Sequence, residues 1–152
     1  MSTETEMKNI MTRSIETDMS AVDKSYKLFK LKKAEFWIID SDMRYELIGT
    51  SGDIYEGLAQ IIIPRDTFGM MVKTCGWAAP LAEDGSVSGR PSEHEARRRV
   101  RLHYLVTDDG HAQGIVFKEK TRKLTTESMV VSFDEGQGLL RDEMTNAWGA
   151  RV

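Results

Sequence analysis

The stretch Arg97–Gly110 reads RRRVRLHYLVTDDG and predicts a β-strand that runs into a tight turn. Asp109-Gly110 is a strong hairpin signal, so Ala112–Glu119 is expected to return as the second strand. Alternate residues of a strand lie on the same face, so several of the arginines share one side. The sequence therefore predicts a hairpin with a row of positive charge, and that charge needs an anion to balance it.

The predicted hairpin has an apolar inner face and a basic outer face. A two-residue loop at Asp109-Gly110 pairs Asp108 with His111 and sets the register. The inner face then holds Val100, Leu102, Tyr104, Ile115 and Phe117. The outer face holds Arg99, Arg101, His103 and Lys118. Arg101 lies opposite Lys118 in this register, and like charges placed directly opposite destabilise a sheet.

Two interpretations of this basic face remain open. Acidic side chains nearby in the sequence would form a surface salt-bridge lattice with it, and each such pair contributes little. The internal candidates are Glu93, Glu95, Glu119, Glu127, Asp134 and Glu135. Alternatively, the face docks onto an acidic partner or a phosphate backbone.

Composition favours one packed domain in a reducing compartment. The chain has 152 residues, of which 40% are hydrophobic and 30% charged, and this is enough to bury a sizeable core. Its net charge of -3 means that nucleic-acid binding would need a local basic patch. Cys75 is the single cysteine, which excludes an intrachain disulfide and favours a cytoplasmic location. The longest apolar run, at 58–63, is too short to span a bilayer.

The chain divides into a tail and a domain. Residues 1–23 carry five acidic and two basic side chains with few apolar ones, so we expect a partly disordered acidic tail. Residues 24–152 are expected to form a single domain. Glycine, serine and charge dominate 81–91, which predicts a flexible loop within that domain.

The order of elements predicts an α+β fold. Besides the hairpin, β-branched and alternating residues predict strands at 35–40, 44–49, 68–74 and 129–133. One helix is expected to open at Asp53 and end at Pro64, and another covers Leu139–Trp148. Hairpins dominate, so we expect a mostly antiparallel sheet of about five to six strands with two short helices packed on one face.

A second basic segment follows the tail. Residues 24–33 combine five lysines with aromatic and apolar side chains and contain no acid. Lysines of this kind commonly protect the edge of a sheet. The alternative is nucleic-acid binding, for which the candidate residues are Lys27, Lys30, Lys32, Lys33, Arg99 and Arg101.

The sequence shows no catalytic constellation. His94-Glu95 begins like a zinc-protease helix, but Arg98 stands where the second histidine is required. We therefore expect a protein that is not an enzyme and that holds no metal or cofactor. One alternative stays open, a site assembled in space from His94, Glu95, His103 and Cys75.

Two patches carry a resemblance to a known group of proteins. The segment Gly76–Pro80 reads GWAAP, and Pro91–Leu102 leads into the basic strand. Together they resemble uncharacterised small proteins of actinobacteria and their phages, in which such a segment precedes a basic strand. The resemblance covers the C-terminal half and implies a phage accessory protein, with no functional residue to carry over.

The functional expectation is a non-enzymatic interaction protein. Its partner would be another macromolecule, a protein of acidic surface, with Arg99, Arg101, His103, Lys118 and Trp77 at the interface. An exposed tryptophan is a common energetic centre of such interfaces. Self-association through free sheet edges and nucleic-acid binding are the alternatives.

Overall fold

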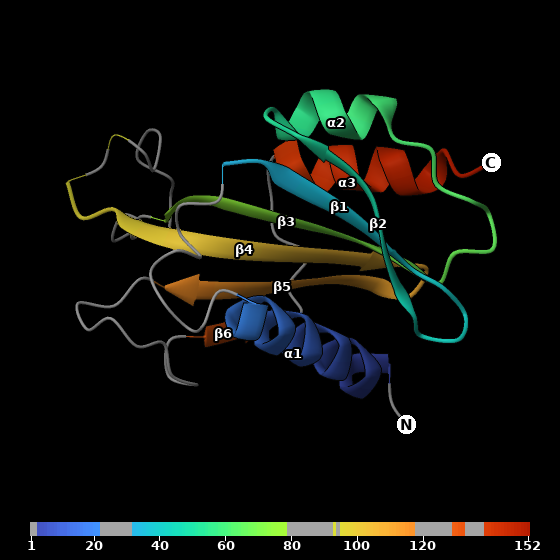
Figure 1. Cartoon of the computed structure of the whole chain (residues 1–152), viewed down its shortest axis with the longest axis horizontal. Coiled ribbons are helices and arrows are strands. Elements are labelled where there is room, and N and C mark those ends of the chain that lie inside the picture. The colour runs from blue at the N-terminus through green and yellow to red at the C-terminus, as the bar shows by residue number, and fades with distance from the viewer. Residues whose placement is uncertain (1–2, 22–31, 79–92, 94, 118–128, 133–138) are drawn as a thin grey trace.

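The computed structural model describes residues 3–21, 32–78, 93, 95–117, 129–132 and 139–152. Its elements in chain order are α1 (Thr3–Ala21), β1 (Ala34–Ile39), β2 (Tyr45–Ser51), α2 (Ile54–Gln60), β3 (Gly69–Ala78), β4 (Arg98–Thr107), β5 (Gly110–Phe117), β6 (Met129–Ser132) and α3 (Leu139–Gly149). The strands form one six-stranded sheet in the order β2-β1-β3-β4-β5-β6, with every neighbouring pair antiparallel (Figure 1). The predicted α+β fold is confirmed. The predicted loop at 81–91 lies outside the described residues.

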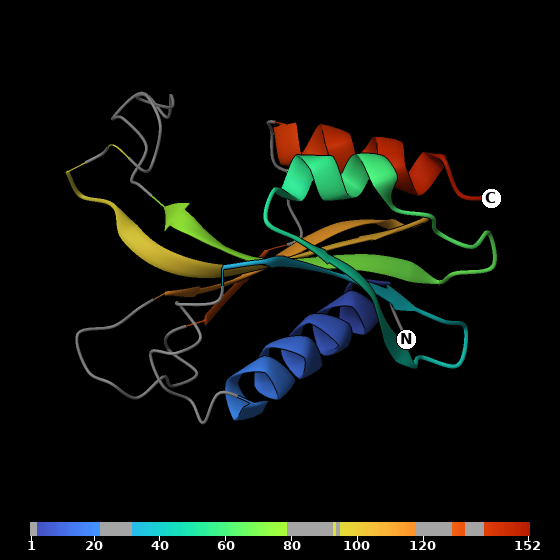
Figure 2. The same ribbon diagram turned by 45° about the horizontal axis from the view of Figure 1, so that its top comes forward.

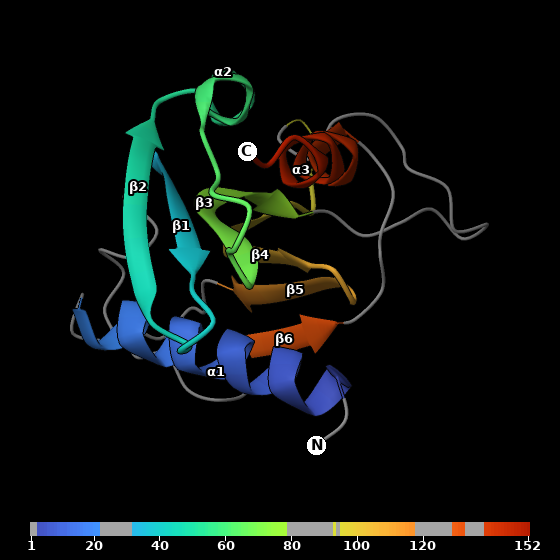
Figure 3. The same ribbon diagram turned by 90° about the vertical axis from the view of Figure 1, so that its right-hand side faces the viewer.

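Helices cover both faces of the sheet. Figure 2 shows α1 on one face, with α2 and α3 together on the other. The two predicted helices correspond to α2 and α3, whose buried residues belong to one core. The third helix was not predicted, and it turns the opposite face of the sheet into a second core (Figure 3).

The expectation of a partly disordered acidic tail at residues 1–23 is wrong for Thr3–Ala21, which forms α1. Met7, Ile10, Met11 and Ile15 are buried, and their spacing of three and four residues puts them on one stripe of a helix. That stripe packs against β4 and β5. Tertiary packing stabilises a helix whose sparse apolar content suggests disorder when composition alone is considered.

The opposite face is closed by α2 and α3. The carboxylate of Asp53 caps α2 by accepting from the backbone N–H groups of Tyr55 and Glu56. From α3, Met144 and Trp148 enter the core beside β4. The Nε1–H group of Trp148 donates to Asp108 at 3.0 Å and so fastens α3 to the β4–β5 turn.

The hairpin register differs from the prediction by two residues. The loop is Asp108-Asp109, with Thr107 opposite Gly110, and Gly110 takes a positive φ of 144°. The backbone N–H of Asp109 donates to the Thr107 side chain at 3.1 Å, which stabilises this turn. Arg101 consequently lies opposite Val116 rather than Lys118. A shift of two residues leaves every side chain on its predicted face.

Gly114 lets α1 approach the sheet closely. A Cβ atom at this position would lie 2.6 Å from Met11 Sδ and 2.7 Å from Ile15 Cδ1, and both of these side chains are fully buried. We expect Gly114→Ala to lower the free energy of unfolding by about 1–3 kcal/mol, since overpacking forces the helix to shift. Urea unfolding measures the effect. Gly49→Ala is the matched control, because no described atom lies within 4 Å of its added Cβ, and equal losses would contradict the prediction.

Candidate functional site

The hairpin pattern predicts Arg101 and His103 on an outward face, and for these two residues that prediction is wrong. Neither side chain exposes any surface. Both lie on the side of β4 that carries Leu105, which is the face beneath α1. The alternation of the strand is as predicted, but the second face of the sheet meets a helix instead of water.

The buried guanidinium of Arg101 faces a carboxylate from another strand. Its Nη2 lies 3.7 Å from Oε2 of Glu35 on β1, and its Nη1 lies 3.7 Å from the Cys75 sulfur on β3. The other carboxylate oxygen of Glu35 accepts from the Trp37 indole N–H at 2.9 Å. Glu35 therefore supplies part of the balancing charge, and it is not among the acids that sequence proximity suggests.

His103 helps to dock α1 on the sheet. Its Nδ1 forms a hydrogen bond with Ser14 Oγ at 3.0 Å, and Ser14 lies on the buried stripe of α1. The contact joins residues that are far apart in the sequence. Arg101 and His103 thus hold parts of the fold together and are not accessible to a partner. Neither residue can therefore belong to the interface that the sequence predicts.

The surface part of the predicted interface is Trp77 together with the start of β4. Trp77 lies opposite Arg99 in the register, and 41% of its surface is exposed. The guanidinium carbons of Arg97 and Arg99 each lie 5.1 Å from the centre of its indole ring. On the other face of the sheet, Arg98 lies 4.5 Å from the centre of the Phe117 ring.

Part of the predicted lysine segment lies at the same end of the sheet. Lys32 and Lys33 immediately precede β1 and are exposed. Lys32 and Cys75 line one small cavity, which places the start of β1 beside the last residues of β3. Lys27, Lys30 and Lys118 lie outside the described residues. We call this cluster the basic end, and it comprises Lys32, Lys33, Trp77, Arg97, Arg98 and Arg99.

The basic end projects from the covered part of the sheet. Figure 1 and Figure 2 show β3 and β4 extending past α2 and α3 at this end. The described acids there include Glu93 and Glu95, which are exposed just before β4, and Asp53, which lines one cavity together with Lys32. Positive side chains therefore outnumber negative ones among the described residues of this end.

Comparisons of the chain with protein-family models, curated proteins and solved structures find no match. The function must therefore be inferred from the arrangement of the side chains. Among the described residues, none of the helices combines the length and the apolar composition that a membrane span needs.

The histidines and the cysteine do not come together as a site in the described part of the chain. His103 faces α1, whereas His111 lies on the opposite face and forms a hydrogen bond of 2.9 Å with the Tyr104 hydroxyl. No group of three histidine, cysteine, aspartate or glutamate side chains is placed to hold a metal ion within the described residues. His94, one member of the alternative catalytic set, lies outside them.

Proposed function

We propose that the protein is a non-enzymatic interaction protein that binds an acidic protein surface through its basic end. The single observation that carries this proposal is Trp77, which is exposed on a sheet surface beside the guanidinium groups of Arg97 and Arg99. Tryptophan and arginine are among the residues most enriched in the energetic centres of protein interfaces. The GWAAP resemblance includes Trp77 and supports an accessory role, as a phage-encoded protein.

The contacts around Trp77 favour binding with little reorganisation. The Nη1 of Arg99 donates to the backbone carbonyl of Gly76 at 3.5 Å, so this side chain is held against β3. Side chains that are already ordered lose less conformational entropy when a partner binds. Positive charge on the surrounding residues would raise the association rate with an acidic partner.

Nucleic-acid binding is the second candidate. One observation favours it, because Trp77 supplies the aromatic ring beside the arginines that base stacking requires. This candidate uses the same basic end but predicts a steep loss of affinity with salt.

We expect Trp77→Ala and Arg99→Glu each to weaken partner binding by at least about tenfold, as removal of an interface centre does. The measurement is affinity capture on the immobilised protein from lysate of its source cells, with quantitative mass spectrometry. The control is Arg65→Glu, which makes the same change of charge on an exposed side chain shortly before β3 begins, whereas Trp77 lies near the end of that strand.

The outcomes separate the two candidates. Proteins that are lost with both basic-end variants but retained by Arg65→Glu support the proposal. Loss of the same proteins after nuclease treatment would assign the surface to nucleic acid instead. If no protein responds selectively to either variant, the proposed function is wrong. Light scattering of the same preparations tells whether the partner is a second copy of the chain.

A further inference from the structure

The end of the sheet opposite the basic end gathers carboxylates from three loops. The strands β1, β3 and β4 meet there in register, because Ile39 pairs with Gly69 and Gly69 pairs with Thr107 (Figure 1). We call this cluster the acidic end, and it comprises Asp40, Asp42, Asp66, Asp108 and Asp109. The strands β3 and β4 each have 10 residues, so a length of about 30 Å separates the acidic end from the basic end.

A hollow opens at the acidic end. Its volume is about 390 Å³, within the range of about 300–1,000 Å³ that is usual for pockets that enclose a small molecule. Phe68 forms part of its wall, and the acidic residues that line it are Asp66, Asp108 and Asp109. An aromatic wall surrounded by carboxylates is the chemical complement of an exposed indole ring beside two guanidinium groups.

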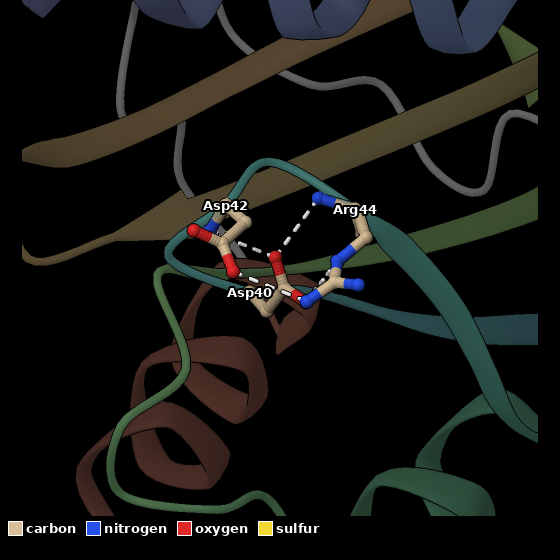
Figure 4. Close-up of polar contacts among 3 residues, drawn as sticks. All are labelled: Asp40, Asp42 and Arg44. Atoms are coloured by element: carbon tan, nitrogen blue, oxygen red, sulfur yellow. Dashed lines mark hydrogen bonds and ion pairs between the residues drawn. The ribbon is translucent and has the colours of Figure 1, made fainter.

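Arginines balance the carboxylates of the acidic end only in part. Figure 4 shows Asp40 and Asp42 sharing the guanidinium of Arg44, at 3.2 Å and 3.1 Å. The pKa of Asp40 lies below its ordinary value, chiefly because Asp40 accepts a hydrogen bond from the backbone N–H of Arg44, so this carboxylate stays ionised. Asp108 has its own partner, Arg151, at 2.9 Å.

Asp66 and Asp109 carry the remaining negative charge. Both are exposed, and neither forms an ion pair within the described part of the chain. Arg65 also lines the hollow, so three aspartates and two arginines surround it. Among the described residues the acidic end is therefore negative overall, whereas the basic end is positive.

We propose that the basic end binds the acidic end of a second copy of the chain, with Trp77 in the hollow. The indole ring lies against Phe68 in this contact, and the neighbouring arginines face Asp66 and Asp109. This partner depends on the proposed function, because it supplies the acidic surface that the basic end requires. The two surfaces lie at opposite ends of the same strands, so the contact is heterologous and joins copies head to tail.

Both ends keep their intrachain contacts in this interface. A guanidinium group has five N–H donors, so Arg97 and Arg99 can donate to carboxylates of the second copy while they stay beside the Trp77 ring. Asp66 and Asp109 can accept without losing an ion pair. Charge-assisted hydrogen bonds of this kind are among the stronger ones, and little reorganisation is needed to form them.

The first test measures whether the full chain associates with itself. Sedimentation velocity and light scattering give the average mass over a series of protein concentrations up to about 1 mM, the range in which weak contacts form. We expect the mass to rise with concentration and to rise less at high salt, because salt screens the attraction between the charged ends. A chain that stays monomeric throughout would overturn this partner. The proposed function would still stand on its capture experiment, which detects other proteins.

The second test assigns the contact to the two ends. Arg99→Glu alters the basic end, and the double variant Asp66→Lys/Asp109→Lys alters the acidic end. We expect each to associate at least about tenfold more weakly than the unaltered chain. Glu16→Lys is the matched control, since it reverses an exposed acidic side chain of α1 that does not line the hollow, and it should associate as the unaltered chain does.

A mixture of the two variants tests the head-to-tail arrangement. The Arg99→Glu chain keeps its acidic end, and the double variant keeps its basic end, so an equimolar mixture should form pairs that neither variant forms alone. Circular dichroism checks that each variant is folded, and Asp66→Lys alone replaces the double variant if Asp109→Lys disturbs the β4–β5 turn. Undiminished association of either variant alone, or a mixture that stays monomeric, would refute the assignment.

Discussion

Arg101→Glu is expected to destabilise the protein by more than about 3 kcal/mol, whereas Arg99→Glu should cost less than about 1 kcal/mol. The two arginines belong to one strand and point to the same face. Arg101 is completely buried beneath α1, with the carboxylate of Glu35 at 3.7 Å, so a glutamate there would bring two negative charges together away from water. Arg99 is partly exposed, and water can solvate its replacement.

Urea unfolding of both variants, followed by circular dichroism, measures this difference. Arg101→Met is an informative third variant, because it keeps much of the side-chain volume while removing the buried charge. It should lose less stability than Arg101→Glu, since apolar replacements of buried ions are often tolerated. Similar losses for Arg99→Glu and Arg101→Glu would show that α1 does not cover this face of the sheet.

Met11→Ala and Ile15→Ala are each expected to lower the free energy of unfolding by about 2–5 kcal/mol. Both side chains are fully buried between α1 and the sheet. Their truncation removes apolar contacts and leaves a cavity over Leu105 and Val116, which close the same core from below. The size of this effect distinguishes a docked helix from a tail, since truncations in a disordered tail cost almost nothing.

Thermal and urea unfolding are the measurements for these truncations, and Asn9→Ala is the control. Asn9 lies on the exposed side of the same helix, and alanine there should be neutral or slightly stabilising because of its higher helix propensity. Losses below about 0.5 kcal/mol at both buried positions, as for ordinary surface substitutions, would contradict the docked position of α1.

Much of the fold could be predicted from local patterns. Strand alternation identified the hairpin and placed Leu102 and Tyr104 on one face with Arg101 and His103 on the other. Asp53 marked the start of α2 because its capping role depends only on backbone groups a few residues away. These features depend on short-range chemistry, and short-range chemistry can be recognised in the sequence.

The candidate sites were less predictable. The sequence identified Trp77 as a candidate interface residue. It did not indicate that Trp77 lies opposite Arg99, because that pairing depends on the register between β3 and β4, which no local motif specifies. The cavity beneath α1, which Arg13 and Tyr45 help to line, was not predicted, because these two residues come from segments that the sequence assigns to a tail and to a hairpin. The signal that was available for α1 was the helical spacing of Met7, Ile10, Met11 and Ile15, and low apolar content obscured it.

The sequence by itself determined which side chains share a face, because alternation along a strand is a local property of the backbone. Only the tertiary structure decided whether a face meets water or a core. Arg101 and Arg99 occupy equivalent positions on one strand, yet α1 buries the first, while the second lies at the basic end of the sheet. Burial depends on the packing of segments distant in the chain, and for that reason Glu35 on β1, rather than a neighbouring acid, faces the buried arginine.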